Sequence, residues 1–309
     1  MRRMNRRSFF LLSALALLLV GCGSDGGDPR SKHALVIGID GLRPDALQEA
    51  STPSIDSLVA DGAVTYDAFA GGELGTATEQ QTFSGPGWSS NLTGVWTDKH
   101  GVIDNDVSAV RVDEYPHFFQ RIRESRPDAY LSSFAMSMIN DYILTPGDAD
   151  EVFTPDEETS VENDAARTDA AVAHLAVESP DVMFVYFNDV DHEGHVFGYG
   201  PTVPEYMQAL ETVDQQIGQI LSALRARETF EQEDWLVLVN TDHGGTGQRH
   251  GEQTPEERTI PMIASGGATR RGQTISPGPG QTAVPSTVLR HLGIPIDPAW
   301  GWESAPFGF

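Results

Sequence analysis

Acidic residues and histidines cluster directly behind short apolar segments of this sequence. They lie at Asp40-Gly41, in the segment NDVDHEGH (188–195), in the segment TDHGG (241–245) and at His250-Gly251. If the apolar segments are parallel strands, their carboxyl ends meet at one edge of a sheet, which is where such sheets bind ligands. Carboxylate oxygens and imidazole nitrogens are common ligands of zinc and similar ions. The coincidence of these segments therefore predicts a metal site at that edge.

The elements that must position these residues can be read from the hydrophobic pattern. Short apolar runs predict buried strands at 33–40, 129–135, 182–187, 235–240 and 260–264. Apolar residues at helical spacing predict helices at 161–178, 205–227 and 286–292. Strands that alternate with helices indicate an α/β fold, with three α/β/α layers around a mostly parallel sheet. The segment 105–165 is acidic and less regular, and we expect an insertion or a lid within it.

The first residues have the pattern of an export signal. Four arginines precede the apolar run 9–20, which is too short to span a bilayer comfortably. The run ends in Leu19-Val20-Gly21-Cys22, which resembles a bacterial lipobox. We therefore expect a lipoprotein signal peptide (1–21), a lipidated Cys22, a flexible tether (22–32) and a catalytic domain (33–309). The alternative is a plain signal peptide with an incidental cysteine. Cys22 is the only cysteine, so no disulfide or thiol chemistry remains once it is lipidated.

The net charge of −25 limits the partners. No basic patch survives removal of the signal, so we exclude polymeric nucleic acid as a partner. A strongly acidic protein can bind an anionic substrate only where bound cations make the local charge positive.

Five motifs in order carry a family resemblance: DGLRPD (40–45), a Ser/Thr loop ending in TG (93–94), DxxxH (191–195), TDHG (241–244) and HG (250–251). This series resembles the nucleotide pyrophosphatase/phosphodiesterase family of the alkaline phosphatase superfamily. The resemblance covers about 33–295 and implies that superfamily's core fold. It also implies two divalent metal ions, expected to be zinc. One would be held by Asp40, Asp242 and His243 with Ser84, and the other by Asp191, His195 and His250. Asp189 and His192 are weaker local candidates, since Asp189 has no histidine four positions on.

The resemblance also assigns the nucleophile. The family carries a Thr or Ser two residues before a proline and ten before the glycine of the TG pair. Ser84 meets both counts, whereas Thr82, Ser89 and Ser90 do not. A bound zinc would lower the pKa of the Ser84 hydroxyl, and two metals about 4 Å apart would stabilise the attacking and leaving oxygens. A phosphoseryl intermediate is the expected result.

One position departs from the family. An asparagine that donates to a phosphoryl oxygen usually follows the loop proline, but Gly87 stands here. We expect the backbone N–H of Gly85 or the side chain of Asn105 to take its place. Trp88 could stack on a base or an aryl group, or pack under the loop. For Arg43 an ion pair with a neighbouring carboxylate is preferred over a contact with substrate phosphate.

These observations predict an exported, membrane-anchored hydrolase of small phosphate esters, facing the periplasm or the cell surface. A phosphodiesterase/pyrophosphatase is favoured because the chain is acidic and has no evident third metal cluster. A phosphomonoesterase or a phosphonate hydrolase on the same site is the alternative. A sulfatase is disfavoured, because Trp88 stands where its loop arginine belongs. A non-catalytic surface-binding lipoprotein is the alternative of another class. The leaving group, the metal's identity and the oligomeric state stay open.

Overall fold

The computed structural model describes residues 30–155 and 162–309. The described residues form one eight-stranded sheet in the order β4-β3-β5-β1-β6-β7-β2-β8. The strands are β1 (Ser31–Ile39), β2 (Gly62–Phe69), β3 (Leu131–Phe134), β4 (Glu151–Phe153), β5 (Val182–Phe187), β6 (Glu233–Asn240), β7 (Thr259–Gly266) and β8 (Gln273–Thr274). Five neighbouring pairs are parallel, and β7 runs antiparallel to both of its neighbours. The mostly parallel sheet is confirmed.

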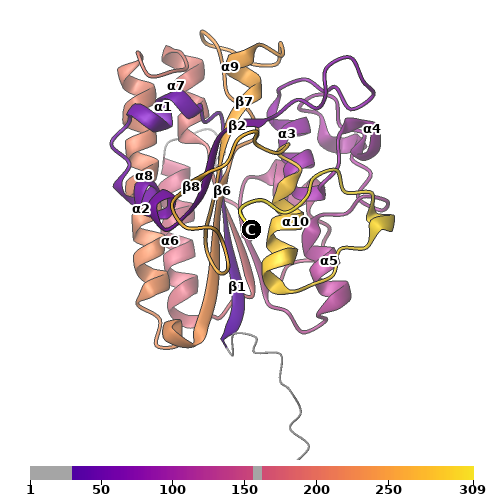
Figure 1. Ribbon diagram of the computed structural model, residues 1–309, viewed down its shortest axis with the longest axis vertical. Coiled ribbons are helices and arrows are strands. Elements are labelled where there is room, and N and C mark those ends of the chain that lie inside the picture. Colours follow the sequence, from indigo (N-terminus) through magenta and orange to yellow (C-terminus); the bar gives the residue numbers. More distant parts are fainter. Residues whose placement is uncertain (1–29, 156–161) are drawn as a thin grey trace, which may run out of the picture.

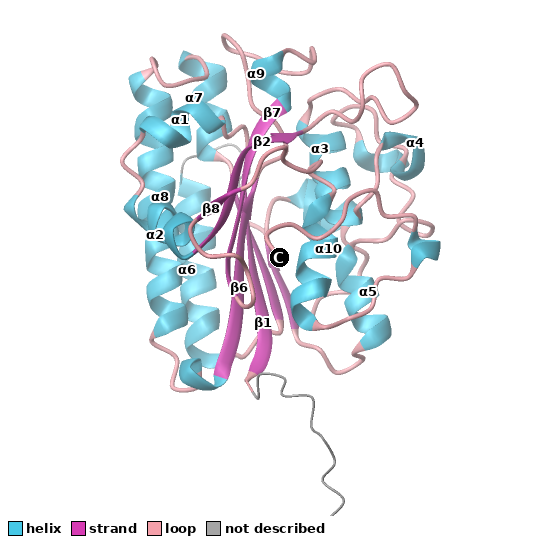
Figure 2. Cartoon of the chain, in the orientation of Figure 1, coloured by secondary structure: helices cyan, strands magenta, loops and turns pink. Residues whose placement is uncertain are grey.

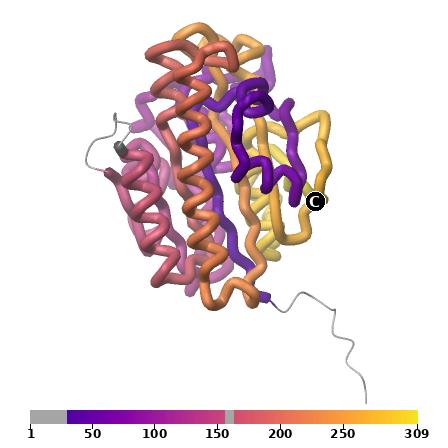
Figure 3. The backbone as a smooth tube through the Cα atoms, turned by 90° about the vertical axis from the view of Figure 1, so that its left-hand side faces the viewer, coloured from indigo at the N-terminus to yellow at the C-terminus, as the bar shows by residue number. Residues whose placement is uncertain are grey.

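Helices cover both faces of the sheet, which gives the predicted three layers (Figure 1). One face carries α1 (Pro44–Glu49), α2 (Pro53–Asp61), α6 (Glu162–Val177), α7 (Asp189–Phe197) and α8 (Pro204–Arg225). The other carries α3 (Ser84–Thr93), α4 (Thr97–His100), α5 (Phe118–Ser125) and α10 (Ala283–Leu292), as Figure 2 shows. The short α9 (Pro255–Arg258) lies at the top, before β7. Turned by 90°, α6 and α8 lie side by side in front of the strands (Figure 3).

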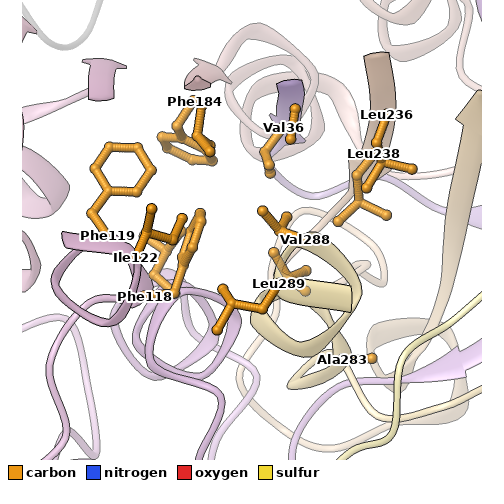
Figure 4. Close-up of a cluster of buried hydrophobic side chains, with 14 of the residues drawn as sticks. Val36, Phe118, Phe119, Ile122, Phe184, Leu236, Leu238, Ala283, Val288 and Leu289 are labelled. Atoms are coloured by element: carbon orange, nitrogen blue, oxygen red, sulfur yellow. The ribbon is translucent and has the colours of Figure 1, made fainter. Parts of the chain in front are cut away.

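The core consists of two apolar clusters separated by the sheet. Alternate residues of β1 serve each side, because successive side chains of a strand point to opposite faces. Val36 packs in the cluster of α5 and α10, which includes Phe118 and Val288 (Figure 4). Leu35 and Ile37 pack on the opposite side with α6 and α8. A strand that is apolar on both faces is therefore buried on both, as a central parallel strand requires.

Helix α8 has both the end signals and the hydrophobic spacing that predicted it. Pro204 occupies its first turn, where a missing N–H costs nothing, and Glu205 follows it there. Its buried residues from Tyr206 to Leu224 recur at helical spacing and form one apolar stripe.

The predicted elements match the observed ones closely, with three corrections. Strand β1 begins at Ser31, so Ser31 and Lys32 pair with β6 and do not belong to the flexible tether. Strands β2, β4 and β8 were not predicted. The segment 105–165 supplies β3, β4 and α5 to the core, so only its loops are available as a lid.

The predicted signal peptide, Cys22 and most of the tether lie outside the described residues. Within the described ranges, no helix is both long and apolar enough to cross a membrane.

Candidate functional site

A cavity of about 500 Å³ opens at the carboxyl edge of the sheet, where the predicted site was placed. It is lined by Asp40, Ser84, Asn105, Asp106, Val107, Ser108, Met136, Ser137, Met138, Tyr142, Tyr186, Asn188, Asp191, His192, His195 and His250. These residues come from the ends of β1 and β5, the start of α3, helix α7 and the loops before β3 and β4. The fold thus brings together residues more than 200 positions apart in the sequence.

Asp40, Asp242 and His243 form the first ligand group. They follow the adjacent strands β1 and β6 directly, and one ligand atom of each lies within 4.8 Å of the others. The Nε2 atom of His243 is 3.1 Å from Oδ2 of Asp242 and 3.5 Å from Oδ1 of Asp40. All three residues are buried. Such a set of two carboxylates and one imidazole suits zinc or a similar divalent cation.

Polar neighbours orient the first ligand group. Oδ2 of Asp40 accepts hydrogen bonds from Nε1 of Trp88 at 2.9 Å and from the Tyr186 hydroxyl at 2.7 Å. The Nδ1 atom of His243 lies 2.8 Å from the carbonyl of Gly244, which leaves Nε2 to face the carboxylates. Oδ1 of Asp40 and Oδ2 of Asp242 are buried and have no hydrogen-bond partner. These two oxygens are suited to bind a cation, because a buried carboxylate oxygen without a hydrogen bond is costly.

Asp191, His195 and His250 form the second ligand group. The first two are four residues apart on α7, so they share one face of the helix. Nε2 of His195 lies 3.4 Å from Oδ2 of Asp191 and 3.0 Å from Nε2 of His250. Nε2 of His250 lies 3.7 Å from Oδ1 of Asp191. Two imidazole nitrogens and a carboxylate converge, and half of the His195 side chain is exposed.

Hydrogen bonds with neighbouring groups also orient the second ligand group. The Tyr199 hydroxyl donates to Oδ1 of Asp191 at 2.5 Å. The Nδ1 atom of His195 lies 3.1 Å from the carbonyl of Gln248, and Nδ1 of His250 lies 2.7 Å from the carbonyl of Thr82. A backbone carbonyl at Nδ1 fixes each ring with Nε2 toward the cavity, the orientation that metal-binding histidines need.

The two groups differ in electrostatics. Burial, reinforced by the charge of Asp191, raises the pKa of Asp40 to about 6. Burial likewise raises the pKa of Asp242 well above its ordinary value, with further contributions from Asp40 and Asp191. The first ligand group therefore holds negative charge at a cost that a divalent cation would remove.

In the second group, charges offset one another. The hydrogen bond with Asp191 raises the pKa of His195 to about 9, against the opposing effect of burial. Burial would raise the pKa of Asp191, but its hydrogen bond with His195 and the nearby histidines outweigh burial and lower it. Burial and the neighbouring His243 lower the pKa of His250 to about 3.

Ser84 lies where a nucleophile would be needed. It is the first residue of α3, and its Oγ is 3.2 Å from Nε2 of His243. The Gly85 N–H donates to Oδ1 of Asn105 at 2.8 Å, so these two predicted substrate contacts are already joined. Asn105 lines the cavity and has the Nδ2 branch of its amide left for another acceptor.

Trp88 requires a correction. Its side chain is fully buried and does not line the cavity, so the predicted stacking on a substrate ring is wrong. The indole packs edge-on against Tyr186 and Phe184. It also fills the space over Gly38, where a Cβ would lie 2.5 Å from the ring. Packing under the loop was the alternative, and in that position Trp88 supports Asp40.

The other candidate residues make structural contacts or line a cavity. Asp189 belongs to neither ligand group and lines a separate cavity with Glu193. Arg43 binds Asp45 through two hydrogen bonds and the carbonyl of Gly245 through a third. Thr82 donates to Glu257, in a buried pair. His192 lines the cavity.

Tyr186 and Tyr199 were not predicted as hydrogen-bond partners of Asp40 and Asp191. The only available signal was their type and place: a tyrosine at the end of a buried strand, and another just past the metal-binding helix.

Known proteins resemble this chain in sequence. The family model described as "Type I phosphodiesterase / nucleotide pyrophosphatase" matches residues 34–254, which is more than half of the chain. Bis(5'-adenosyl)-triphosphatase ENPP4 of Bos taurus is 22% identical over 74% of this chain and 51% of its own length. Ectonucleotide pyrophosphatase/phosphodiesterase family member 7 of Homo sapiens is 24% identical over 76% of this chain and 53% of its own length. The chain thus spans about half the length of these curated relatives.

Solved structures share the fold. Murine ectonucleotide pyrophosphatase/phosphodiesterase 5 matches with a TM-score of 0.65 at 15% identity, over 85% of this chain and 95% of its own. A phosphonate monoester hydrolase from Silicibacter pomeroyi matches with a TM-score of 0.65 at 15% identity, over 90% and 76%. At this identity the likeness shows the alkaline phosphatase-like fold alone. The matched family model, together with this fold, establishes that the chain belongs to the type I phosphodiesterase/nucleotide pyrophosphatase family of the alkaline phosphatase superfamily.

Proposed function

We propose that this protein hydrolyses phosphate diesters through a phosphoseryl intermediate on Ser84, with two divalent cations, zinc by preference, in the two ligand groups. The observation that carries the proposal is the position of the Ser84 hydroxyl. It lies 3.2 Å from Nε2 of His243, in a cavity that both ligand groups reach. A nucleophile beside a pair of ligand sets is the arrangement that in-line displacement at phosphorus requires.

The residues present fit the cations. The orphaned oxygens Oδ1 of Asp40 and Oδ2 of Asp242 would hold one, together with Nε2 of His243. Asp191, His195 and His250 would hold the other. When bound, the cations would supply positive charge that lowers the pKa of the attacking hydroxyl and stabilises the leaving oxygen.

The chain's own groups account for the remaining steps. Ser84 Oγ gives its proton to water in the cavity and attacks phosphorus, so the Oγ–P bond forms as the bond to the leaving alkoxide breaks. Asn105, held by the N–H of Gly85, offers its Nδ2 group to a non-bridging phosphoryl oxygen. Water then cleaves the Oγ–P bond and restores the serine.

The test is hydrolysis of bis(p-nitrophenyl) phosphate and p-nitrophenyl phosphate by the mature protein, supplied with zinc or treated with a chelator. We expect faster turnover of the diester, loss of it in Ser84→Ala by at least about 10³-fold, and loss with the chelator. The matched control is Ser222→Ala, since that hydroxyl bonds only to its own helix. Faster monoester turnover would assign the chain to the phosphatases. Equal rates in wild type and Ser84→Ala would refute the proposed nucleophile.

We further propose that the protein is exported and anchored through a lipid on Cys22, as the lipobox pattern suggests. The described chain starts at the amino edge of the sheet, and the cavity opens at the carboxyl edge (Figure 1). Such an anchor would attach the domain at the end opposite the cavity, so the substrate would arrive from the surrounding medium. Labelling with a radioactive fatty acid should mark the wild-type protein and not Cys22→Ser. Equal labelling of both would refute the anchor.

A further inference from the structure

The charged side chains that line the cavity are mainly acidic. Among its lining residues in the described chain there is no lysine and no arginine. Apart from the ligands, the charged side chain on the wall is that of Asp106, which is exposed. Asp106 is kept in place because its carboxylate accepts the N–H of Ser108 at the start of a short turn, η1 (Val107–Ala109). A substrate therefore meets positive charge only where cations or protonated histidines supply it.

Basic side chains of the neighbouring loops are already engaged. Arg43 binds Asp45 and the Gly245 carbonyl, and these hydrogen bonds outweigh burial and raise its pKa. Arg258 donates to the carbonyls of Gly71 and Gly72. Lys99 binds the carbonyl of Gly301 and the carboxylate of Glu303. Moving any of these three to the cavity would break two or more hydrogen bonds. Arg249, beside His250, is exposed and in the described chain pairs only with Glu252 at 3.8 Å, but it does not line the cavity.

Part of the cavity lining is apolar, next to Ser108 and Ser137. It consists of Val107 from η1 and of Met136, Met138 and Tyr142, the last two from a π-helical turn, η2 (Met138–Ile143). Half of the Tyr142 side chain is exposed, and both methionines are partly exposed. Flexible thioethers and an aromatic ring bind apolar and aromatic groups well and give charged groups no partner.

We propose, on the basis of the proposed function, that the substrate is a singly charged ester. It is a phosphate diester or a phosphonate monoester whose non-leaving group is uncharged and apolar or aromatic, and this group lies against Met136, Met138 and Tyr142. Two divalent cations, if bound, would leave one positive charge beside the three carboxylates of Asp40, Asp242 and Asp191, which one phosphoryl anion would neutralise. A further negative charge on the substrate meets Asp106, and no lysine or arginine lines the described cavity to pair with it. Polyphosphates and carboxylate-bearing esters are therefore selected against.

The experiment uses substrates that share the p-nitrophenolate leaving group and differ in the other substituent: methyl, phenyl or 4-carboxyphenyl. We expect kcat/KM to be higher for the phenyl ester than for the methyl ester. Tyr142→Ala and Met138→Ala should reduce that ratio several-fold, and Tyr142→Phe should retain it. The carboxyphenyl ester should be about 3–10-fold poorer than the phenyl ester, the size expected for one like charge nearby. Asp106→Asn should narrow that gap, and Asp113→Asn, an exposed acid outside the cavity, should not.

Either of two results would overturn the inference. One is equal or better turnover of the carboxyphenyl ester by the wild type. The other is a phenyl-to-methyl ratio that survives both Tyr142→Ala and Met138→Ala. Ser84-dependent turnover without these preferences would leave the proposed function intact and refute the inference. Equilibrium dialysis of the same esters with zinc-loaded Ser84→Ala protein measures substrate binding in the absence of turnover. Preferential binding of the phenyl ester there, with no turnover by the wild type, would support the inference and refute the hydrolase.

Discussion

The two edges of this sheet treat buried carboxylates in opposite ways. At the amino edge, acidic residues beside the strand starts are paired with arginines: Glu233 with Arg227, Asp234 with Arg30, Asp150 with Arg123 and Asp181 with Arg126. At the carboxyl edge, the ion-pair partners of Asp40, Asp191 and Asp242 in the described chain are histidines. Arginines at the carboxyl edge pair with other acids, Arg43 with Asp45 and Arg167 with Asp164, so these three aspartates have no arginine partner in the described chain.

Strand β6 has one such carboxylate at each end. Burial alone would raise the pKa of Glu233, but hydrogen bonds from Arg227, Thr229 and Trp235 outweigh it and lower the pKa to about 2. Burial raises the pKa of Asp242 well above its ordinary value, and neither an arginine nor a lysine pairs with it in the described chain. An arginine partner at one end of β6 and a histidine partner at the other thus distinguish a structural carboxylate from one positioned to bind a cation.

The largest expected effect comes from removing the carboxylate of Asp242. Asp242→Asn should lower diester turnover by about 10³-fold or more, because the first ligand group loses a charged ligand beside Ser84. It should also abolish most of the rise in Tm that zinc gives the wild type. The control is Glu233→Gln at the other end of β6, which should keep turnover and zinc content per protein. An Asp242→Asn protein that binds two zinc ions and turns over normally would contradict the comparison.

The residues that orient the ligands give a smaller, selective effect. Trp88→Phe removes the indole donor to Asp40 and should weaken zinc binding in the first ligand group by about 10–100-fold. Tyr199→Phe removes the donor to Asp191 and should do the same in the second group. Zinc titration followed by calorimetry resolves the two classes of site. Each variant is the control for the other, and weakening of both classes by either variant would refute separate orientation of the groups.

In the metal-free protein, the same substitution that destroys activity should increase stability. Asp242→Asn removes a buried carboxylate whose Oδ2 atom accepts no hydrogen bond, and should raise the free energy of unfolding by about 1–3 kcal/mol at pH 7. Because the folded-state pKa is raised, the Asp242 carboxyl binds a proton in the folded state as pH falls, and its cost disappears. The gain from the variant should therefore shrink as the pH falls toward 3.8, the ordinary pKa of this carboxyl. Urea unfolding in the presence of a chelator measures it, and a destabilised variant at pH 7 would contradict the prediction.

The paired carboxylate should show the opposite sign and a different pH window. The folded-state pKa of Glu233 is lowered, so its stabilisation is complete above its ordinary pKa of 4.5 and disappears as pH falls toward about 2. Glu233→Gln should lower the free energy of unfolding on the order of 1–2 kcal/mol at pH 7, and by little near pH 2. Urea unfolding across this range tests it. A deficit that stays constant down to pH 2 would exclude the ion pair as the cause.

Much of the fold could be predicted because its pattern is local. The strand 182–187 and the helices 161–178 and 205–227 followed from apolar runs and helical spacing, and each has its observed counterpart within two residues. Strand β2 was missed because its sequence, GAVTYDAF, includes glycine and aspartate and continues directly from α2. Strand β8 has only two residues and no apolar pattern to detect.

The types of ligand, and their position behind the strands, followed from the sequence alone, since a strand end fixes where the next residue must lie. The choice of Ser84 as nucleophile came from the family resemblance and stays a prediction; the structure has this residue at the start of α3. Only the tertiary structure decided that Trp88 lies beneath Asp40 and away from the substrate, because an indole can pack or stack with equal ease. It alone decided which carboxylates are paired, since Arg227 and Glu233 meet through their loop whereas Asp242 meets Asp40 from the far end of the chain. Pairing depends on three-dimensional proximity, and residue type and spacing do not specify it.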